Sequence, residues 1–466
     1  MASGHASRAE SNRKALFIAL IACATAALFL LPAPDGASAS AFQGIALIFL
    51  AISLWASGLL ATYLTAVLFF FATLVTGVAP PQVVFAGFHS TAVWLVFGGL
   101  FIGLAVKQSG LGARAVRLCL ALVGASYPRL VVALTAGGLL LAFVVPSSMG
   151  RVLLLMPIVL ALADAVGLTD ERKGRMGLVL AAAMGTMLPS FAILPANVPN
   201  MALIGAAESI YGVHFFYGAY LLLNFPVLGL LTALAIPLLI LRFFPDRVAD
   251  APPGVPASAW SRAEKRLLLI MAITVACWAL DVLHGLSPAW VALGAAIALL
   301  WPGLGVIPAS AFKEIDFAPW LFVAGVIGLG AVAAHSGAAA LAGGWLLAHL
   351  DLAALPPWQQ YAGIVGLGMV IALMTGLPAA PALMTPLAAE LSRQSGWPLE
   401  SVLLAQVPTW IAFGFAYQAP PIMVALALAK IPVARVAKLL LAYLAVGVLV
   451  TLPLHYLWGT LLGVFP

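Results

Sequence analysis

The sequence predicts an all-α integral membrane protein, and three observations support this fold class. The 466 residues are 64% hydrophobic and only 8% charged, whereas soluble domains carry about 25% charged residues. The apolar runs are long and continuous, unlike the alternating segments of about 10 residues that build a membrane barrel. The 21 lysines and arginines concentrate between the runs, so the formal charge of +6 indicates membrane topology and not a nucleic-acid surface.

The apolar runs predict about 11 transmembrane helices, since one helix needs roughly 20 apolar residues to cross a bilayer. The N-terminal section, 1–80, contains three of them. Its first run follows a basic start and precedes small residues at 36–41, as a cleavable signal peptide would. We favour an uncleaved helix because the run is long and further apolar runs follow at once.

The rest of the chain contains two sections of similar order, 81–243 and 304–466. A proline-rich cytoplasmic linker at 244–262 and two connecting helices at 263–303 separate them. Three pairs of landmarks are separated by nearly the same number of residues: Trp94-Leu95 and Trp320-Leu321, Pro157 and Pro386, and Gly185 and Gly414. This spacing favours an internal duplication. Chance similarity among helices rich in Leu, Ala and Gly is the alternative.

Each section contains an apolar run that stops at a small or proline-rich turn and then resumes, which predicts a re-entrant hairpin. The first hairpin occupies 128–166 and is interrupted within 143–157; the second occupies 357–394 and is interrupted within 372–386. Each half is expected to be too short to cross a bilayer. A proline-broken helix follows each hairpin. Interrupted backbone at membrane depth is tolerated where it lines a cavity, and a pair of such segments predicts the substrate site of a secondary transporter.

The basic residues also predict the orientation of the chain. With a cytoplasmic N-terminus and hairpins that enter from opposite sides, every lysine and arginine except Arg151 and Arg393 lies on the cytoplasmic side. The two sections are therefore predicted to be inverted repeats, with the first hairpin opening from the cytoplasm and the second from outside. An odd number of spans places the C-terminus outside the cell inner (plasma) membrane.

This pattern resembles the divalent anion:sodium symporters and the wider ion-transporter superfamily, from about Pro81 to Ala437. In that family each repeat has a surface helix, here matched by 110–124 and 337–351, a hairpin and a broken helix. Each hairpin tip there carries a Ser-Asn-Thr motif that helps to bind substrate and sodium. The corresponding positions here are Ser147-Ser148-Met149 and Gly376-Leu377-Pro378. The resemblance also implies a homodimer with an elevator-like movement.

The altered hairpin tips leave the coupling ion open. Hard cations take oxygen ligands, and the second tip offers no polar side-chain atom. A sodium ion, if used, is expected near Ser147, Gly185 and Gly376. Proton coupling or anion exchange is the alternative, and no organic cofactor is expected.

Arg151, in the first hairpin, is the most informative single residue. A charged side chain at membrane depth is costly and therefore indicates a functional site by default. Arginine can hold a carboxylate or a sulfate with two parallel hydrogen bonds. We hypothesise that Arg151 supplies the positive charge that bound sodium supplies in the symporters. The alternatives are a structural pair with Asp164 or another carboxylate, and a side chain that extends to the membrane surface.

The other candidate substrate-binding residues are small or polar and lie at the hairpin tips and helix breaks. Ser147 and Ser148 lie where a half-helix N-terminus presents N–H groups to an anion, although small residues also allow close packing. The remaining candidates are Asn197, Asn200, Thr375, Gly376 and Gln418. The amide side chains of Asn197, Asn200 and Gln418 could equally bind backbone groups that the helix breaks leave without a partner. Asp164, Glu208 and Glu390 are considered as proton carriers, with solvated positions favoured.

The predicted function is secondary transport of a small anion by alternating access. Dicarboxylates, tricarboxylates, sulfate and sulfonates all suit a cationic site with hydrogen-bond donors. The alternatives within the superfamily are a sodium-coupled dicarboxylate symporter and a cation/proton or arsenite carrier. A channel is a further alternative. An intramembrane enzyme is disfavoured because the spans contain no HExxH, no GxGD and no convincing Ser/His or Ser/Lys pair.

Overall fold

The computed structural model describes residues 2–33, 38–111, 114, 126–145, 147–248, 259–303, 305–341 and 352–466. These residues form helices and turns, and no strand occurs among them. Helices suit the apolar sequence because an α-helix satisfies its own backbone N–H and C=O groups without water. The chain divides into two compact units, each described by itself below.

Within the described residues, 6 helices are long and apolar enough to cross a membrane. They are Thr91–Ser109, Ser148–Ala165, Lys173–Ala192, Tyr217–Phe243, Ala318–Ser336 and Val433–Leu461. Shorter apolar helices are Lys14–Leu30, Ala39–Trp55, Thr62–Thr76, Tyr127–Ala142 and Pro288–Leu300. The protein is thus a helical membrane protein, whereas the total number of spans and the inverted relation of the repeats remain predictions.

Unit 1 comprises Met1–Val93, Ala202–His214 and Ala318–Gln406. Its elements are α1 (Ala2–Leu30), α2 (Ala39–Ser57), α3 (Thr62–Thr76), α4 (Pro81–Val84), α5 (Ala86–His89), most of α11 (Val198–Tyr211), α17 (Ala318–Ser336), η5 (Leu352–Ala354), α19 (Pro357–Thr375), α20 (Ala380–Met384), η6 (Thr385–Leu387), α21 (Ala388–Ser395) and α22 (Leu399–Ala405).

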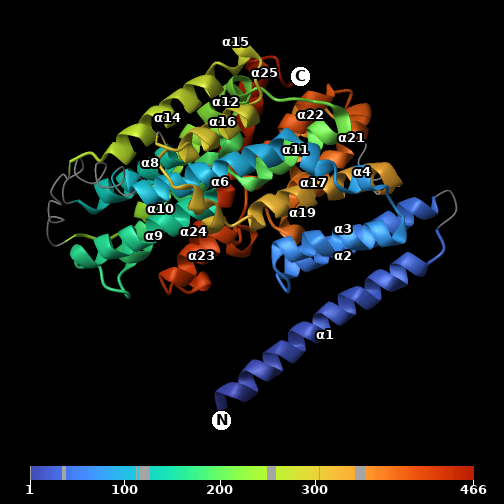
Figure 1. Ribbon diagram of the computed structural model, residues 1–466, viewed down its shortest axis with the longest axis horizontal. Coiled ribbons are helices and arrows are strands. Elements are labelled where there is room, and N and C mark those ends of the chain that lie inside the picture. Colours follow the sequence, from blue (N-terminus) through green and yellow to red (C-terminus); the bar gives the residue numbers. More distant parts are fainter. Residues whose placement is uncertain are drawn as a thin grey trace. The chain divides into compact units, whose positions relative to one another are not determined.

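Close helix packing in unit 1 depends on small residues along α17. This helix packs against α2, α3 and α5, and α2 and α3 lie side by side (Figure 1). A Cβ added at Gly325 of α17 would lie 2.5 Å from the Cβ of Ala66 in α3, and one at Gly87 would lie 2.3 Å from the carbonyl oxygen of Ala324. Glycine at these positions lets the helix backbones approach, as is usual in membrane proteins.

Unit 2 comprises Trp94–Met201, Phe215–Phe317 and Val407–Pro466. Its elements are most of α6 (Thr91–Ser109), α8 (Tyr127–Ala142), α9 (Ser148–Ala165), α10 (Lys173–Met187), η1 (Pro189–Ala192), η2 (Leu194–Ala196), α12 (Tyr217–Asn224), η3 (Phe225–Leu231), α13 (Thr232–Phe243), α14 (Arg262–Ala279), α15 (Asp281–His284), α16 (Pro288–Leu300), η4 (Ala309–Glu314), η7 (Val407–Trp410), η8 (Ala416–Gln418), α23 (Pro420–Leu428), α24 (Val433–Val446), η9 (Gly447–Thr451) and α25 (Leu452–Leu461).

Helix α10 forms the core of unit 2. It packs against α8, α9, α13 and α23 (Figure 1), and the residues of its apolar window are all buried. Two glycines bring α8 and α10 together. A Cβ at Gly138 of α8 would lie 2.7 Å from the backbone nitrogen of Thr186, and one at Gly185 of α10 would lie 2.6 Å from the Cα of Thr135. Gly185, expected near a sodium ion, therefore has a packing role here.

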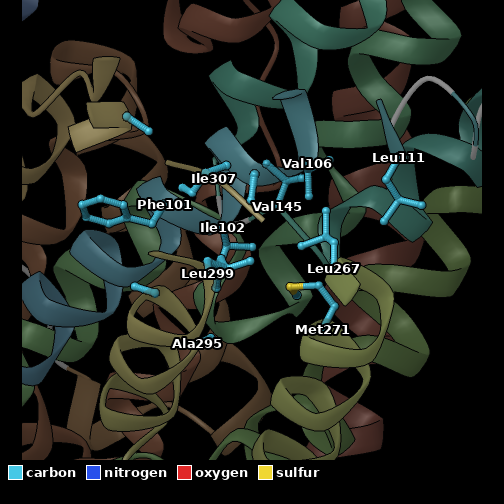
Figure 2. Packing of buried hydrophobic residues seen from close by; sticks show 13 residues of the cluster. Phe101, Ile102, Val106, Leu111, Val145, Leu267, Met271, Ala295, Leu299 and Ile307 are labelled. Atoms are coloured by element: carbon cyan, nitrogen blue, oxygen red, sulfur yellow. The ribbon is translucent and has the colours of Figure 1, made fainter. Parts of the chain in front are cut away.

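A hydrophobic cluster fixes the turn of the first hairpin within unit 2 (Figure 2). Its members from α6, α14 and α16 include Phe101, Ile102, Val106, Leu267, Met271, Ala295 and Leu299. Val145, which lies between α8 and α9, belongs to the same cluster and is 3% exposed. Burial of these side chains holds the hairpin turn against α6 and the connecting helices.

The first hairpin consists of α8 and α9, which a short connection after Ala142 joins. Helix α9 has 18 residues and qualifies by length and composition as a membrane span. The expectation that each half of a hairpin is too short to cross the bilayer is therefore wrong for α9, because its helix continues through Pro157. In the second hairpin, α19 has 19 residues, and the second leg is divided into α20, η6 and α21. Re-entrance of both hairpins stays a prediction.

The two units do not follow the predicted sections of the chain. Unit 1 combines the second hairpin with the end of α11, and unit 2 combines the first hairpin with α23, α24 and α25. Residues 249–258 of the linker lie outside the described residues, as do most of the predicted surface segments at 110–124 and 337–351.

Candidate functional site

Helix α9 begins at the hairpin turn because Ser147 caps it. The Ser147 backbone is extended, with φ −143° and ψ 109°, and its hydroxyl accepts a hydrogen bond from the Gly150 N–H at 3.1 Å. A capped N-terminus still leaves N–H groups that carry partial positive charge. The first hairpin thus presents the positive end of a helix dipole at its turn.

Arg151 lies one turn into α9 and is fully buried, at 0% exposure. Its Nε donates to the Thr186 hydroxyl at 2.9 Å and also to the Thr186 carbonyl at 3.2 Å, which Nη2 binds as well. Its Nη2 donates to the Thr186 carbonyl at 2.8 Å and to the Ser148 hydroxyl at 3.0 Å. Its Nη1 donates to the Ala196 carbonyl at 3.0 Å and to the Val145 carbonyl. A guanidinium has five N–H groups, so each of them has a protein acceptor.

The oxygen atoms around Arg151 come from four separate places in unit 2. They are the hairpin turn (Val145), α9 (Ser148), α10 (Thr186) and η2 (Ala196). We call these three carbonyl and two hydroxyl oxygens the oxygen cluster. Because one guanidinium binds all of them, Arg151 connects the hairpin to the helix that breaks after it.

Arg151 has no salt bridge with any carboxylate of the described residues. Asp164, considered as its partner, instead pairs with Arg175, which also contacts Asp170 at 3.0 Å. The structural pair between Arg151 and Asp164 is therefore wrong, because the two residues lie at opposite ends of α9, about 20 Å apart at 1.5 Å per residue. The Arg151 charge is hydrogen-bonded but not neutralised by these residues.

The hydrogen bonds of Arg151 also decide how it can act on a ligand. A direct clamp on a carboxylate needs two free N–H groups, and the described arrangement uses every one for protein oxygens. In this arrangement Arg151 has no N–H left for a direct bond to a ligand, and what it offers is its charge. Ser147 and Ser148 lie beside it, and each hydroxyl accepts one protein hydrogen bond.

Sequence reasoning missed Thr186 and Ala196 as partners of Arg151. Thr186 follows Gly185 directly, and the Gly-Thr pair before the broken segment is the signal that could have identified it. Ala196 contributes only its backbone carbonyl, so no side-chain chemistry marks it.

Asn197 and Asn200 satisfy the backbone of the first broken segment. Prolines interrupt the helix after α10, so this segment lacks the hydrogen bonds of a continuous α-helix. The carbonyls of Ser190 and Ile193 accept turn hydrogen bonds from the N–H groups of Ile193 and Ala196 instead. Asn197 donates to the Ser190 carbonyl at 2.9 Å. Asn200 donates to the Phe191 carbonyl at 2.9 Å and the Ile193 carbonyl at 3.1 Å. The two amides therefore support the break by binding its backbone.

The first broken segment, at 189–200, is also connected to the second broken segment, at 407–419, inside unit 2. The Oδ1 of Asn200 accepts a hydrogen bond from the Trp410 indole at 3.1 Å, and Asn200 is 0% exposed. Both N–H groups of its amide are already bound to carbonyls. Asn200 has no donor left for a substrate in this arrangement.

Gln418 lies in the second broken segment, and its amide is only partly used. Its Oε1 accepts from the N–H groups of Gly414 at 3.3 Å and Phe415 at 3.1 Å. Gln418 is 3% exposed. It belongs to the same unit as Arg151 and comes two residues before α23, which packs against α9 and α10.

Thr375 and Gly376 belong to unit 1. Gly376 ends α19 with φ 80° and ψ 161°, a conformation open essentially to glycine alone. The Thr375 hydroxyl donates to the carbonyl of Ile371 at 2.8 Å. It therefore bonds its own helix, as threonines in membrane helices often do.

Glu208 is not the solvated carboxylate that the sequence favoured. Its side chain is 16% exposed, and it accepts from the Thr91 N–H at 2.9 Å, the Thr91 hydroxyl at 2.7 Å and the Ser90 hydroxyl at 3.1 Å. These donors lie at the start of α6, where a negative charge is stabilised by the helix dipole. Glu390 pairs with Arg393 on an exposed face of α21.

Helices that are interrupted beside a buried, hydrogen-bonded cation are an arrangement typical of membrane transporters. A solved structure with this fold is the YdaH transporter of Alcanivorax borkumensis, with a TM-score of 0.52, 20% identity, and coverage of 86% of this chain and 90% of that chain. The family model for citrate transporters, CitMHS, matches residues 45–429. The chain therefore belongs to the citrate transporter family.

A relative from Cupriavidus necator is described as a membrane protein. It is 25% identical over 354 residues, which cover 70% of this chain and 68% of the relative. The matches confirm a membrane transporter of the wider superfamily. The narrower assignment to the divalent anion:sodium symporters, made from the hairpin pattern, stays a prediction.

Proposed function

We propose that this protein carries a small di- or tricarboxylate across the inner membrane by alternating access, and that it does so without sodium. The family supports the carboxylate class, because the matching model describes citrate transporters. The observation that carries the sodium-independent mechanism is the fully buried Arg151, which is bound by neutral oxygens and has no carboxylate partner among the described residues.

The oxygen cluster has the composition of a cation site. Three carbonyl and two hydroxyl oxygens surround the guanidinium, and hard cations such as sodium take ligands of this kind. Arg151 fills the cluster with a charge that is covalently part of the chain. A fixed charge attracts an anion but cannot leave with it, so a sodium gradient would do no work at this position.

Two sources of positive charge favour an anion near the first hairpin. The N-terminus of a helix contributes about half an elementary charge, and α9 begins only three residues before Arg151. A buried, uncompensated arginine costs on the order of 3 kcal/mol in a membrane helix. A bound carboxylate would offset part of that cost, which gives the site its selectivity for anions.

The test is uptake into proteoliposomes that contain the purified protein. Labelled citrate, succinate and sulfate would be supplied under a sodium gradient, a proton gradient, or exchange against preloaded anion. We expect saturable uptake of a carboxylate that is unchanged when choline replaces sodium. Strict sodium dependence of the wild-type protein would refute the mechanism while leaving the carboxylate class intact.

Variants of Arg151 separate its charge from its hydrogen bonds. We expect Arg151→Lys to keep the charge and retain measurable uptake. Arg151→Gln removes the charge, and we expect it to lower the ratio kcat/KM by roughly tenfold or more, the value of a hydrogen bond or contact to a charged group. Unchanged uptake by Arg151→Gln, in protein that is folded as judged by thermal unfolding, would show that the charge is not used.

A sodium-coupled symporter of the same superfamily is the second candidate, because the polar cluster beside α9 is built of cation ligands. We also propose a homodimer, with the N-terminus in the cytoplasm and the C-terminus outside. Molar mass in detergent tests the dimer. Labelling of cysteines introduced at either end in intact cells tests the orientation.

A further inference from the structure

The two broken segments of unit 2 differ in how their polar atoms are used. In the first break, side chains bind the freed carbonyls: Asn197 binds Ser190, and Asn200 binds Phe191 and Ile193. In the second break, Gln418 and Thr409 carry polar atoms that no described residue binds. Of the two broken segments, the second therefore contains hydrogen-bond donors that have no acceptor among the described residues.

The Gln418 amide has a defined orientation. Its Oε1 accepts from two backbone N–H groups, those of Gly414 and Phe415, so the oxygen must face them and the Nε2 must face the other way. Neither N–H of that nitrogen has an acceptor among the described residues. Gln418 is nonetheless 3% exposed. The Nε2 atom is not among the fully buried atoms that lack a partner, so it keeps a small accessible surface. An acceptor from outside the protein can therefore reach its two N–H groups.

Thr409 gives a second, independent observation on the same segment. Its hydroxyl is buried, with the residue at 0% exposure, and has no hydrogen-bond partner among the described residues. The neighbouring Trp410 is held by Asn200 through a hydrogen bond of 3.1 Å, so the backbone at Thr409 is fixed. Interrupted backbone at membrane depth is tolerated where it is buried in protein or lines a wet cavity.

We propose that Gln418 is a substrate-binding residue whose Nε2 donates hydrogen bonds to carboxylate oxygens of the transported anion, with the Thr409 hydroxyl as an additional donor. This inference rests on the proposed function as a carboxylate carrier. A carboxylate matches the site because its oxygens are acceptors only, whereas the amide nitrogen of Gln418 has two N–H groups to donate. The fixed charge of Arg151 lies in the same unit, on α9, against which α23 packs (Figure 1).

The sharpest variant is Gln418→Glu. A glutamate keeps an oxygen for the N–H groups of Gly414 and Phe415 and removes the two donors. Because a buried charge also costs stability, its thermal unfolding midpoint is measured beside its KM. It also places a negative charge where the anion is proposed to bind. We expect the KM for labelled citrate or succinate to rise roughly tenfold to hundredfold, with a smaller change in maximal rate. Gln418→Met removes the donors without adding charge and should raise KM in the same direction.

Gln360→Met is the matched control, because Gln360 is a buried glutamine whose two ends are both used. Its Nε2 donates to the Leu352 carbonyl at 2.8 Å, and its Oε1 accepts from the Trp397 indole. We expect this variant to lower the thermal midpoint and leave KM unchanged. Thr409→Val removes the unpaired hydroxyl at nearly constant volume and should raise KM by a few fold.

The outcomes separate this inference from the proposed function. If the wild type takes up a carboxylate and both Gln418 variants keep its KM within twofold, the inference is wrong and the proposed function stands. A drop in thermal midpoint together with an unchanged KM would show that the amide binds a structural water. If the wild type takes up neither citrate nor succinate, both fail.

Discussion

The hydrogen bonds of Asn200 make a quantitative prediction about how the broken segments are held. Asn200→Ala leaves the indole N–H of Trp410 without its partner in a fully buried region. It also removes one hydrogen bond from each of two carbonyls, since the Phe191 carbonyl keeps the bond from the Tyr220 hydroxyl and the Ile193 carbonyl keeps the bond from the Ala196 N–H. Each buried group left without a partner costs about 1–3 kcal/mol. The indole N–H accounts for about 1–3 kcal/mol, and the two lost carbonyl hydrogen bonds account for about 0.5–1.5 kcal/mol each. The expected loss is therefore roughly 2–6 kcal/mol, which is a large share of the 5–15 kcal/mol of a typical fold.

A double-mutant cycle isolates the single bond between the two broken segments. Trp410→Phe removes the indole N–H and keeps an aromatic ring, and the cycle combines it with Asn200→Ala. Hydrogen bonds between helices in membranes contribute about 0.6 kcal/mol on average and up to about 1.7 kcal/mol. Since this bond measures 3.1 Å and is shielded from solvent, we expect a coupling free energy toward the upper end of that range.

The assay is reversible unfolding of the purified protein in mixed micelles with increasing denaturing detergent, followed by tryptophan fluorescence. The fluorescence of each Trp410→Phe protein is compared with its own folded and unfolded limits. Additive effects, to within about 0.3 kcal/mol, would refute the conclusion that the bond connects the two breaks. Unchanged stability of Asn200→Ala would refute the wider conclusion that this amide supports the backbone.

Two further predictions concern the loop after α13 and the core of unit 2. Partial burial raises the pKa of Asp246, but hydrogen bonds, of which that from Arg172 is the strongest, outweigh this effect and hold the pKa below its ordinary value. The carboxylate therefore stabilises the fold at pH values above the unfolded pKa of about 3.9. This contribution is lost as the pH falls through the lower pKa of the folded state. Asp246→Asn should lower the thermal midpoint at pH 7 and show a smaller acid-induced decrease than the wild type. Gly185→Ala should destabilise by about 1–3 kcal/mol, because its Cβ would lie 2.6 Å from the Cα of Thr135. Gly294→Ala in α16, where the added Cβ meets nothing within 4 Å, is the control and should be neutral or stabilising in the same thermal assay.

The helical membrane class follows from sequence because hydropathy is a property of residue types in long runs. Chain interruptions are equally visible, since prolines lack an N–H and end helices locally. The turn after Ala142 and the break after Met187 therefore lie where the sequence suggests. The length of α9 could not be derived, because Pro157 is accommodated inside the helix and its tolerance depends on what packs around it.

The hydrogen-bond partners of the candidate amides could not be predicted from the local sequence. Asn200 and Gln418 have the same chemistry and both lie in proline-rich breaks. Only the fold shows that Asn200 has both N–H groups bound to carbonyls, whereas those of Gln418 have no acceptor among the described residues. Thr409 was not singled out from sequence, because a threonine in an apolar helix usually bonds its own backbone.

By itself the sequence determined that this protein is a helical membrane protein with two interrupted hairpins and one arginine in the first of them. It could not determine what surrounds Arg151. A search by residue type looks for a carboxylate such as Asp164, whereas the folded chain supplies the backbone carbonyls of Val145, Thr186 and Ala196. Every residue has a carbonyl, so such partners leave no mark in a sequence. Only the tertiary structure selects them, by breaking helices and bringing distant segments around one charge.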